Sequence, residues 1–197
     1  MSPLSVIVFL LLSNPWADSV VSFDEGVGGS AGYNLPEVAL GEPSRFTGED
    51  IWPSVVSQFN SPWLANEIVS IGAGGSIVVS FDESVQNDPA NPWGIDLLIF
   101  GNTGCVDNSY PQGVVGGVYS DDGGTIEVSQ DGKMWYPITT ALADGLWPTR
   151  GYLDSQPYDA FEGSEPSTFT LPVDPRLSID EVLNLDNDSL VEFYGVS

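Results

Sequence analysis

Apolar and polar residues alternate along the middle of the chain with the period of an extended strand. In the segment Ser76–Asp82, the side chains of Ile77, Val79 and Phe81 fall on one face, and the polar residues Ser76, Ser80 and Asp82 fall on the other. A period of two is typical of an antiparallel strand with one buried face. The segment is therefore predicted to be a half-buried strand.

Three further apolar runs predict additional strands. Ile68–Ile71 precedes the strand at Ser76–Asp82, and the intervening Gly72–Gly75 is predicted to be the connection of a hairpin. Ser19–Phe23 is a short run of β-forming residues. Ile95–Phe100 is almost wholly apolar, so it is predicted to be a central strand covered on both faces.

The strongest local pattern is a hairpin over Thr125–Ile138. Ile126 and Val128 alternate with polar residues, and Asp131-Gly132 then supplies a turn. Asp-Gly tolerates the positive φ angles of a two-residue hairpin turn, so the second strand is expected to begin at Lys133.

The two ends of the chain differ from the middle. Leu4–Leu12 is an apolar run followed by a polar break, which predicts a secretory signal peptide over residues 1–17, cut after Ala17; a first buried strand is the alternative. The run is too short to span a bilayer. Residues 18–197 form the predicted mature domain. Ser178–Tyr194 has helical spacing, interrupted near Asn187, which predicts short C-terminal helices.

Charge limits the partners that the chain can have. The sequence holds 28 Asp and Glu against 4 Lys and Arg, a formal net charge of -24. Such a field repels phosphate backbones and anionic headgroups, so neither nucleic acid nor membrane contact by the mature chain is expected. It attracts cations. Two interpretations remain open: an acidic surface that only keeps the protein solvated, as in saline settings, and a surface that binds metal.

The sequence lacks the histidine on which the common Ser-His arrangement of nucleophilic catalysis depends. It contains no His, which removes the common general base and the commonest transition-metal ligand. Cys105 is the single cysteine, so no intramolecular disulfide is possible, and we expect its thiol to be buried and inert.

Calcium is the metal that fits this composition, because Ca²⁺ takes oxygen ligands from carboxylates, amides and carbonyls on loops. Two acid-rich loop segments supply such groups. The candidate ligands are Asp88, Asn91, Asp107, Asp121 and Asp122. The alternative is that these side chains are solvated turn residues.

Tryptophans beside prolines form a second group of candidates. A loop tryptophan can stack on a sugar ring, although it can equally fill space under a long loop. The candidate stacking residues are Trp52, Trp63, Trp93 and Trp147. Trp135, in the predicted hairpin, is expected to be a packing residue.

Several motifs taken in order resemble a known group of proteins. They are Ala39-Leu40-Gly41-Glu42-Pro43, Val69–Ile77, Phe81-Asp82, Asp96–Asn102 and the Glu127–Gly132 turn that leads to Trp135. This order is similar to bacterial exported or cell-surface proteins, common in planctomycetes, that often carry a PEP-CTERM sorting anchor. The hairpin also resembles discoidin-like and galactose-binding-like modules.

The resemblance implies an all-β fold, a jelly-roll-like antiparallel β-sandwich with long loops, over about residues 18–194. Such proteins usually continue with a closing strand, so we expect this chain, which stops at Ser197, to be a fragment. The implied role is a non-catalytic, exported binding or structural module at the cell surface or outside the cell, with glycans as possible ligands and Ca²⁺ bracing the loops. The alternative is a secreted carbohydrate-active enzyme with an Asp/Glu pair.

Overall fold

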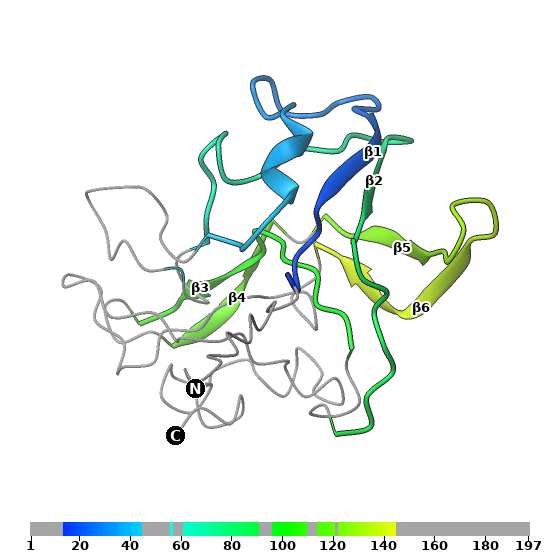
Figure 1. Cartoon of the computed structure of the whole chain (residues 1–197). Coiled ribbons are helices and arrows are strands. Elements are labelled where there is room, and N and C mark those ends of the chain that lie inside the picture. The colour runs from blue at the N-terminus through cyan, green and yellow to red at the C-terminus, as the bar shows by residue number, and fades with distance from the viewer. Residues whose placement is uncertain are drawn as a thin grey trace, which may run out of the picture.

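A computed structural model describes residues 14–44, 56, 61–90, 96–109, 114–120 and 122–144 of the chain. In this part, six strands pair into three two-stranded antiparallel sheets, β1–β2, β3–β4 and β5–β6 (Figure 1). The strands are β1 Ser19–Asp24, β2 Ser76–Ser80, β3 Gly104–Asp107, β4 Val115–Tyr119, β5 Gly124–Val128 and β6 Tyr136–Ala143, and one short 3-10 helix, η1, spans Pro36–Ala39. The predicted antiparallel β class is confirmed at this level.

The first sheet joins two segments that lie far apart in the sequence. β1 pairs with β2 so that Phe23 lies opposite Ile77 and Val20 opposite Val79. The register shifts at Val21, a bulge that leaves this side chain exposed. The Ser19 and Ser80 hydroxyls, at the end of the ladder, lie 2.7 Å apart and share a hydrogen bond. Both predicted strands therefore form.

The predicted hairpin between Ile68–Ile71 and the next strand is wrong. Gly72–Gly75 does form a turn, in which the Gly75 amide donates to the Gly72 carbonyl, but the 68–71 segment is not a strand. A backbone amide of this segment instead forms a hydrogen bond with another loop: the Ser70 amide donates to the Tyr33 carbonyl at 2.8 Å. The strand after the turn pairs with β1 instead.

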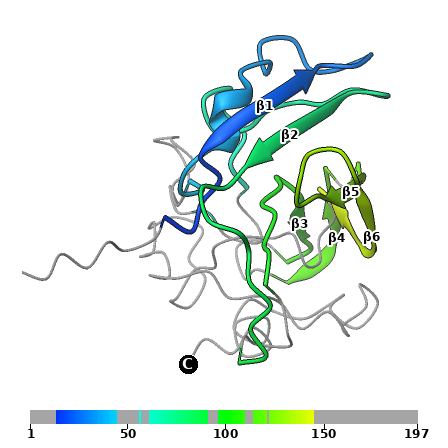
Figure 2. The ribbon, with the colours of Figure 1, turned by 45° about the vertical axis from the view of Figure 1, so that its right-hand side comes forward.

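Glycine allows this arrangement because two backbones touch. A Cβ atom on Gly75 would lie 2.5 Å from the Asp24 carbonyl oxygen, and one on Gly72 would lie 2.6 Å from the Val27 carbonyl oxygen. No L side chain fits at such distances. The glycine run therefore allows the backbones at the ends of β1 and β2 to pack closely. The two strands run side by side in both views (Figure 2).

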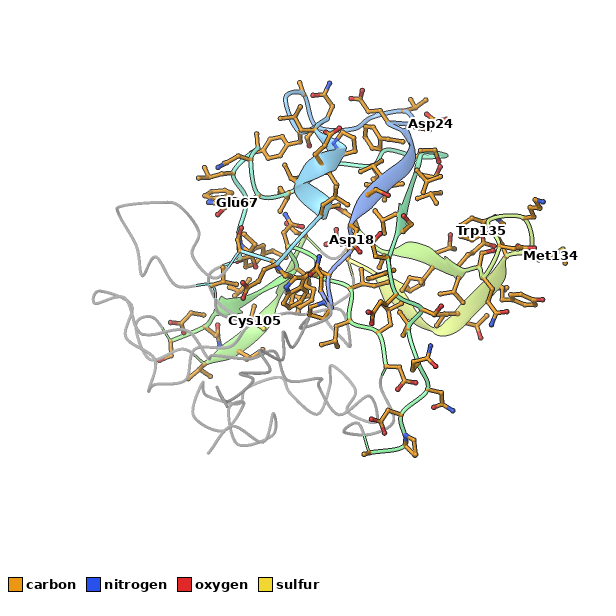
Figure 3. All side chains as sticks on the ribbon, in the orientation of Figure 1. Asp18, Asp24, Glu67, Cys105, Met134 and Trp135 are labelled. Carbon is orange, nitrogen blue, oxygen red and sulfur yellow. The ribbon has the colours of Figure 1, made fainter. Side chains whose placement is uncertain are left out.

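The second sheet carries much of the described core. In β3 and β4, Cys105 lies opposite Val118 and Gly104 opposite Tyr119. Cys105 and Val115 are buried, so the expected burial of the cysteine is confirmed. Figure 3 shows Cys105 within the body of the molecule, on β3.

The third sheet is the predicted hairpin, with a longer loop than expected. β5 and β6 pair with Val128 opposite Tyr136, so residues 129–135 form the loop and the second strand begins after Lys133. Gly132 has a φ of 68°, as the Asp-Gly pair suggests. Side-chain acceptors stabilise the wider loop, since Asp131 Oδ1 accepts hydrogen bonds from the Lys133 and Met134 amides at 2.8 and 2.9 Å.

The apolar segment predicted as a central strand differs from the prediction. Residue 95 lies outside the described residues, and 96–100 are half-buried but form no strand. An apolar run reports burial and does not specify a backbone partner, so periodicity could not separate the two outcomes. Phe100 instead meets Trp16 edge to face, with ring centroids 6.5 Å apart.

Several predictions concern residues that the structure does not describe. They are the helices over Ser178–Tyr194 and most of the signal peptide. Its last residues are described, and the Ala17 carbonyl accepts a hydrogen bond from the Gly41 amide. The cut after Ala17 stays a prediction. Among the described residues, no helix has the length and apolar character needed to cross a bilayer.

The glycine contact yields a test of the first sheet. We expect Gly75→Ala to destabilise the protein by about 3 kcal/mol, the upper end of overpacking, because its Cβ would overlap the backbone of β1. Gly74→Ala is the matched control: Gly74 has a φ of 75° but open space around it, so a cost of about 1 kcal/mol is expected. Urea unfolding measures both. Equal losses would contradict the contact.

The hairpin loop yields a pH dependence. Hydrogen bonds from the Met134 and Lys133 amides hold the pKa of the Asp131 carboxyl below its ordinary value of 3.8. A lowered folded-state pKa means that the contribution to stability is present above pH 3.8 and is lost as the pH falls through the lower folded value. An NMR titration should place the Asp131 midpoint below 3.8, with amide exchange at Met134 rising as it protonates. A midpoint at or above the ordinary value would refute this.

Candidate functional site

One of the four candidate stacking residues lies in the described part, and it is exposed. The Trp63 side chain, in the loop after Ser61, is 56% exposed. Trp52, Trp93 and Trp147 lie outside the described residues. More than half of this indole is in water, so it offers surface on which a ligand could stack.

The backbone that carries Trp63 is fixed by a second loop. The Tyr33 hydroxyl donates a hydrogen bond to the Trp63 carbonyl at 2.8 Å. The Tyr33 carbonyl in turn accepts from the Ser70 amide at 2.8 Å, and the Ser70 hydroxyl accepts from the Ser30 amide at 2.9 Å. Three bonds thus join the segments around residues 30–33 and 63–70, which makes the position of Trp63 well defined.

A tight turn follows Trp63 and adds to this order. The Glu67 amide donates to the Leu64 carbonyl at 2.9 Å, while Glu67 Oε2 accepts from the Leu64 amide at 3.3 Å. Before Trp63, the buried Ser61 hydroxyl donates to the Thr103 carbonyl at 3.1 Å, which ties the loop to the start of β3. The loop is anchored on both sides of the indole, and Glu67 lies at the edge of the molecule in Figure 3.

The tip of the β5–β6 hairpin is a second exposed apolar surface. Met134, Trp135 and Tyr136 are 61%, 38% and 59% exposed. Figure 3 shows Met134 and Trp135 at the outer end of the hairpin. The expectation that Trp135 only packs is therefore incomplete, since more than a third of its surface is in contact with water.

Three of the five candidate calcium ligands lie in the described residues, and they are Asp88, Asp107 and Asp122. Asp88 Oδ1 accepts from the Ala90 amide, and Asp107 Oδ1 accepts from the Ser109 and Val114 amides, all within 3 Å. These are turn-stabilising bonds within each loop. Asp122 is exposed, while Asn91 and Asp121 lie outside the described residues. In the part of the chain that the structure describes, no three acidic or cysteine side chains gather as metal ligands.

The electrostatics of the hairpin loop do not suit acid catalysis. A glycoside hydrolase needs one carboxyl whose pKa is raised so that it can donate a proton. At Asp131 the amides of Met134 and Lys133 lower the carboxyl pKa, which is the opposite direction. Asp131 is therefore a structural acceptor in its loop rather than a proton donor.

Sequence reasoning missed the groups that position Trp63 and a polar cluster around Thr103. Tyr33 gave no signal, since it lies in a glycine-rich segment that predicts a loop. Thr103 is only 2% exposed, and its hydroxyl lies among oxygen atoms from the ends of β4 and β6. Nothing in the sequence around Thr103 marks it as buried and shared between strands.

Comparison with known proteins gives no relative: no family model, no curated protein and no solved structure matches this chain.

Proposed function

We propose that the chain is an exported, non-catalytic binding module that holds a neutral glycan against the indole of Trp63. The observation that carries this proposal is an exposed tryptophan on a loop that hydrogen bonds fix at both sides. The ligand class follows from the aromatic surface and from the charge of the chain.

The loop is already ordered without a ligand, and this preorganisation favours binding. An indole has few rotatable bonds, and the Tyr33 hydroxyl already holds the backbone beneath it. Binding then costs little additional conformational entropy. The apolar face of a sugar ring would cover indole surface that is now in water, which is favourable in proportion to the area removed.

Charge selects a neutral ligand. With a net charge of -24, the chain repels anionic polymers such as sulfated or uronic-acid glycans. Neutral sugars present hydroxyl donors, and carboxylates and amides accept from them. Asn66 and Glu67 lie on the turn that follows Trp63, so an amide and a carboxylate are present in the same loop as the indole.

The finer fold is part of this proposal. A jelly-roll-like β-sandwich is the architecture in which loops at one end of the sheets commonly carry ligands. The antiparallel pairing of all six described strands is compatible with that architecture.

Glycan arrays with the full chain, followed by calorimetry on the neutral oligosaccharides that bind, test the proposal. Trp63→Ala should weaken binding at least ten-fold, about 1.4 kcal/mol, because the stacking surface is removed. It should leave the unfolding midpoint nearly unchanged, since the side chain is exposed.

Trp135→Ala is the matched control, because it removes another exposed indole at a separate place on the fold. It should bind as the unchanged chain does. The proposal fails if no neutral glycan binds, or if Trp63→Ala retains full affinity. Release of reducing sugar ends from a bound oligosaccharide would instead support the enzyme with an Asp/Glu pair.

A further inference from the structure

Two exposed Asp-Gly pairs lie at the two ends of strand β5. The first pair, Asp122-Gly123, immediately precedes the strand, and the second pair, Asp131-Gly132, lies in the loop that follows it. Gly123 and Gly132 have nearly the same backbone angle, with φ values of 66° and 68°. All four residues are exposed. The two pairs therefore match in residue type, in access to water and in the φ angle of the glycine.

Hydrogen bonds hold both functional groups of the second pair. Asp131 Oδ1 accepts from the Lys133 and Met134 amides at 2.8 and 2.9 Å. The Gly132 amide donates to the Ser129 hydroxyl at 2.9 Å. The Met134 and Lys133 amides also lower the pKa of the Asp131 carboxyl, so it stays ionised at neutral pH. The side chain and the next amide nitrogen are thus both fixed by the folded loop.

The first pair differs from the second in exactly this respect. In the part of the chain that the structure describes, neither the Asp122 carboxylate nor the Gly123 amide forms a hydrogen bond. The exposed Asp122 side chain can therefore rotate toward the nitrogen of the next residue without breaking a contact.

The reaction open to an Asp-Gly pair is conversion of aspartate to isoaspartate. The glycine nitrogen, which has no neighbouring side chain to shield it, attacks Cγ of the aspartic acid. A nitrogen–carbon bond forms, and the amide proton leaves with the carboxyl hydroxyl as water, which gives a succinimide ring. Water then opens the ring. Attack at Cγ restores aspartate, whereas attack at the backbone carbonyl carbon gives isoaspartate, so water is the only co-reactant.

We infer that Asp122-Gly123 is a site of isoaspartate formation in the folded chain, and that the hairpin loop protects Asp131-Gly132 from the same reaction. Ring closure at Asp131 must break two hydrogen bonds to a charged group, which are among the stronger ones in proteins. It must also release the Gly132 amide from Ser129. Ring closure at Asp122 requires neither step. A third pair begins at Asp144, but its glycine lies outside the described residues.

The modification would alter the connection that leads into β5. Isoaspartate routes the main chain through Cβ and Cγ, which lengthens it two residues before Gly124. Gly124 pairs with Ala143 at the end of the β5–β6 ladder, so this end of the ladder is the part most exposed to the change. The inference is independent of glycan binding at Trp63, and either can fail without the other.

Peptide mapping of the full chain after storage in warm neutral buffer tests the inference. Cleavage after Glu127 separates the two pairs. Isoaspartyl peptides keep the mass of the parent peptide but differ in retention and in electron-transfer fragments. In the folded chain, Asp122 should isomerise at least ten-fold faster than Asp131, because only Asp131 must first break hydrogen bonds. In urea the two rates should approach each other. Equal rates in the folded chain, or an unchanged ratio in urea, would overturn the inference.

Three variants separate the restraint in the loop from access to water. Ser129→Ala removes the acceptor of the Gly132 amide, so isomerisation at Asp131 should rise at least three-fold while the rate at Asp122 stays the same. Ser84→Ala, the matched change of an exposed serine outside the hairpin, should alter neither rate. Asp122→Glu should abolish the product at the first pair, since glutamate would have to close a larger ring. An unchanged rate at Asp131 in Ser129→Ala contradicts the protection, and product that persists in Asp122→Glu contradicts the site.

Discussion

The contacts of the Thr103 side chain join the β3–β4 sheet to the end of β6, a strand with which that sheet shares no ladder. Each described sheet has two strands, and an isolated pair of that kind is marginal in water. The hydroxyl reaches the ends of β4 and β6, while the carbonyl accepts from Ser61 in the loop that carries Trp63. Four segments thus meet at one buried residue. The end of β6 and the loop that carries Trp63 are joined to the β3–β4 sheet by these polar contacts.

The first sheet depends on a different constraint, which is the absence of side chains. The Gly72–Gly75 turn lies against the end of β1 at distances that only glycine permits. Segments that are distant in the sequence are thus held together in two ways. Hydrogen bonds join them at Thr103, and close backbone packing joins them at the glycine run. In both, backbone groups from distant parts of the sequence approach closely without forming a wider sheet.

Local features of this fold could be predicted from the sequence, and long-range ones could not. The β5–β6 hairpin was predictable because alternation and Asp131-Gly132 lie within one short segment, although the capping of the loop by Asp131 lengthened the turn. The partner of β2 was not, since Ile68–Ile71 has strand-like composition and only the fold shows that β1 takes its place. The apolar 96–100 segment shows the same limit: composition indicates burial without a pairing partner.

The candidate functional residues also divide into those that the local sequence reveals and those that depend on long-range contacts. Trp63 could be selected because its type and loop position are visible in the sequence, whereas Tyr33, which fixes it, could not. The acidic loops suggested metal ligands because carboxylates are easy to see, yet Asp88 and Asp107 cap their own turns. The oxygens around Thr103 are largely backbone carbonyls, which every residue has and which only folding brings together.

Cys105 gives this molecule a built-in reporter of its own opening. It is the single cysteine of the chain, it is buried, and it lies on β3 two residues after Thr103. A thiol-reactive dye can reach its sulfur only when β3 separates from its surroundings, so the labelling rate measures how often that joint opens. Each molecule then carries at most one label, and its attachment marks a specific structural event without any engineered residue.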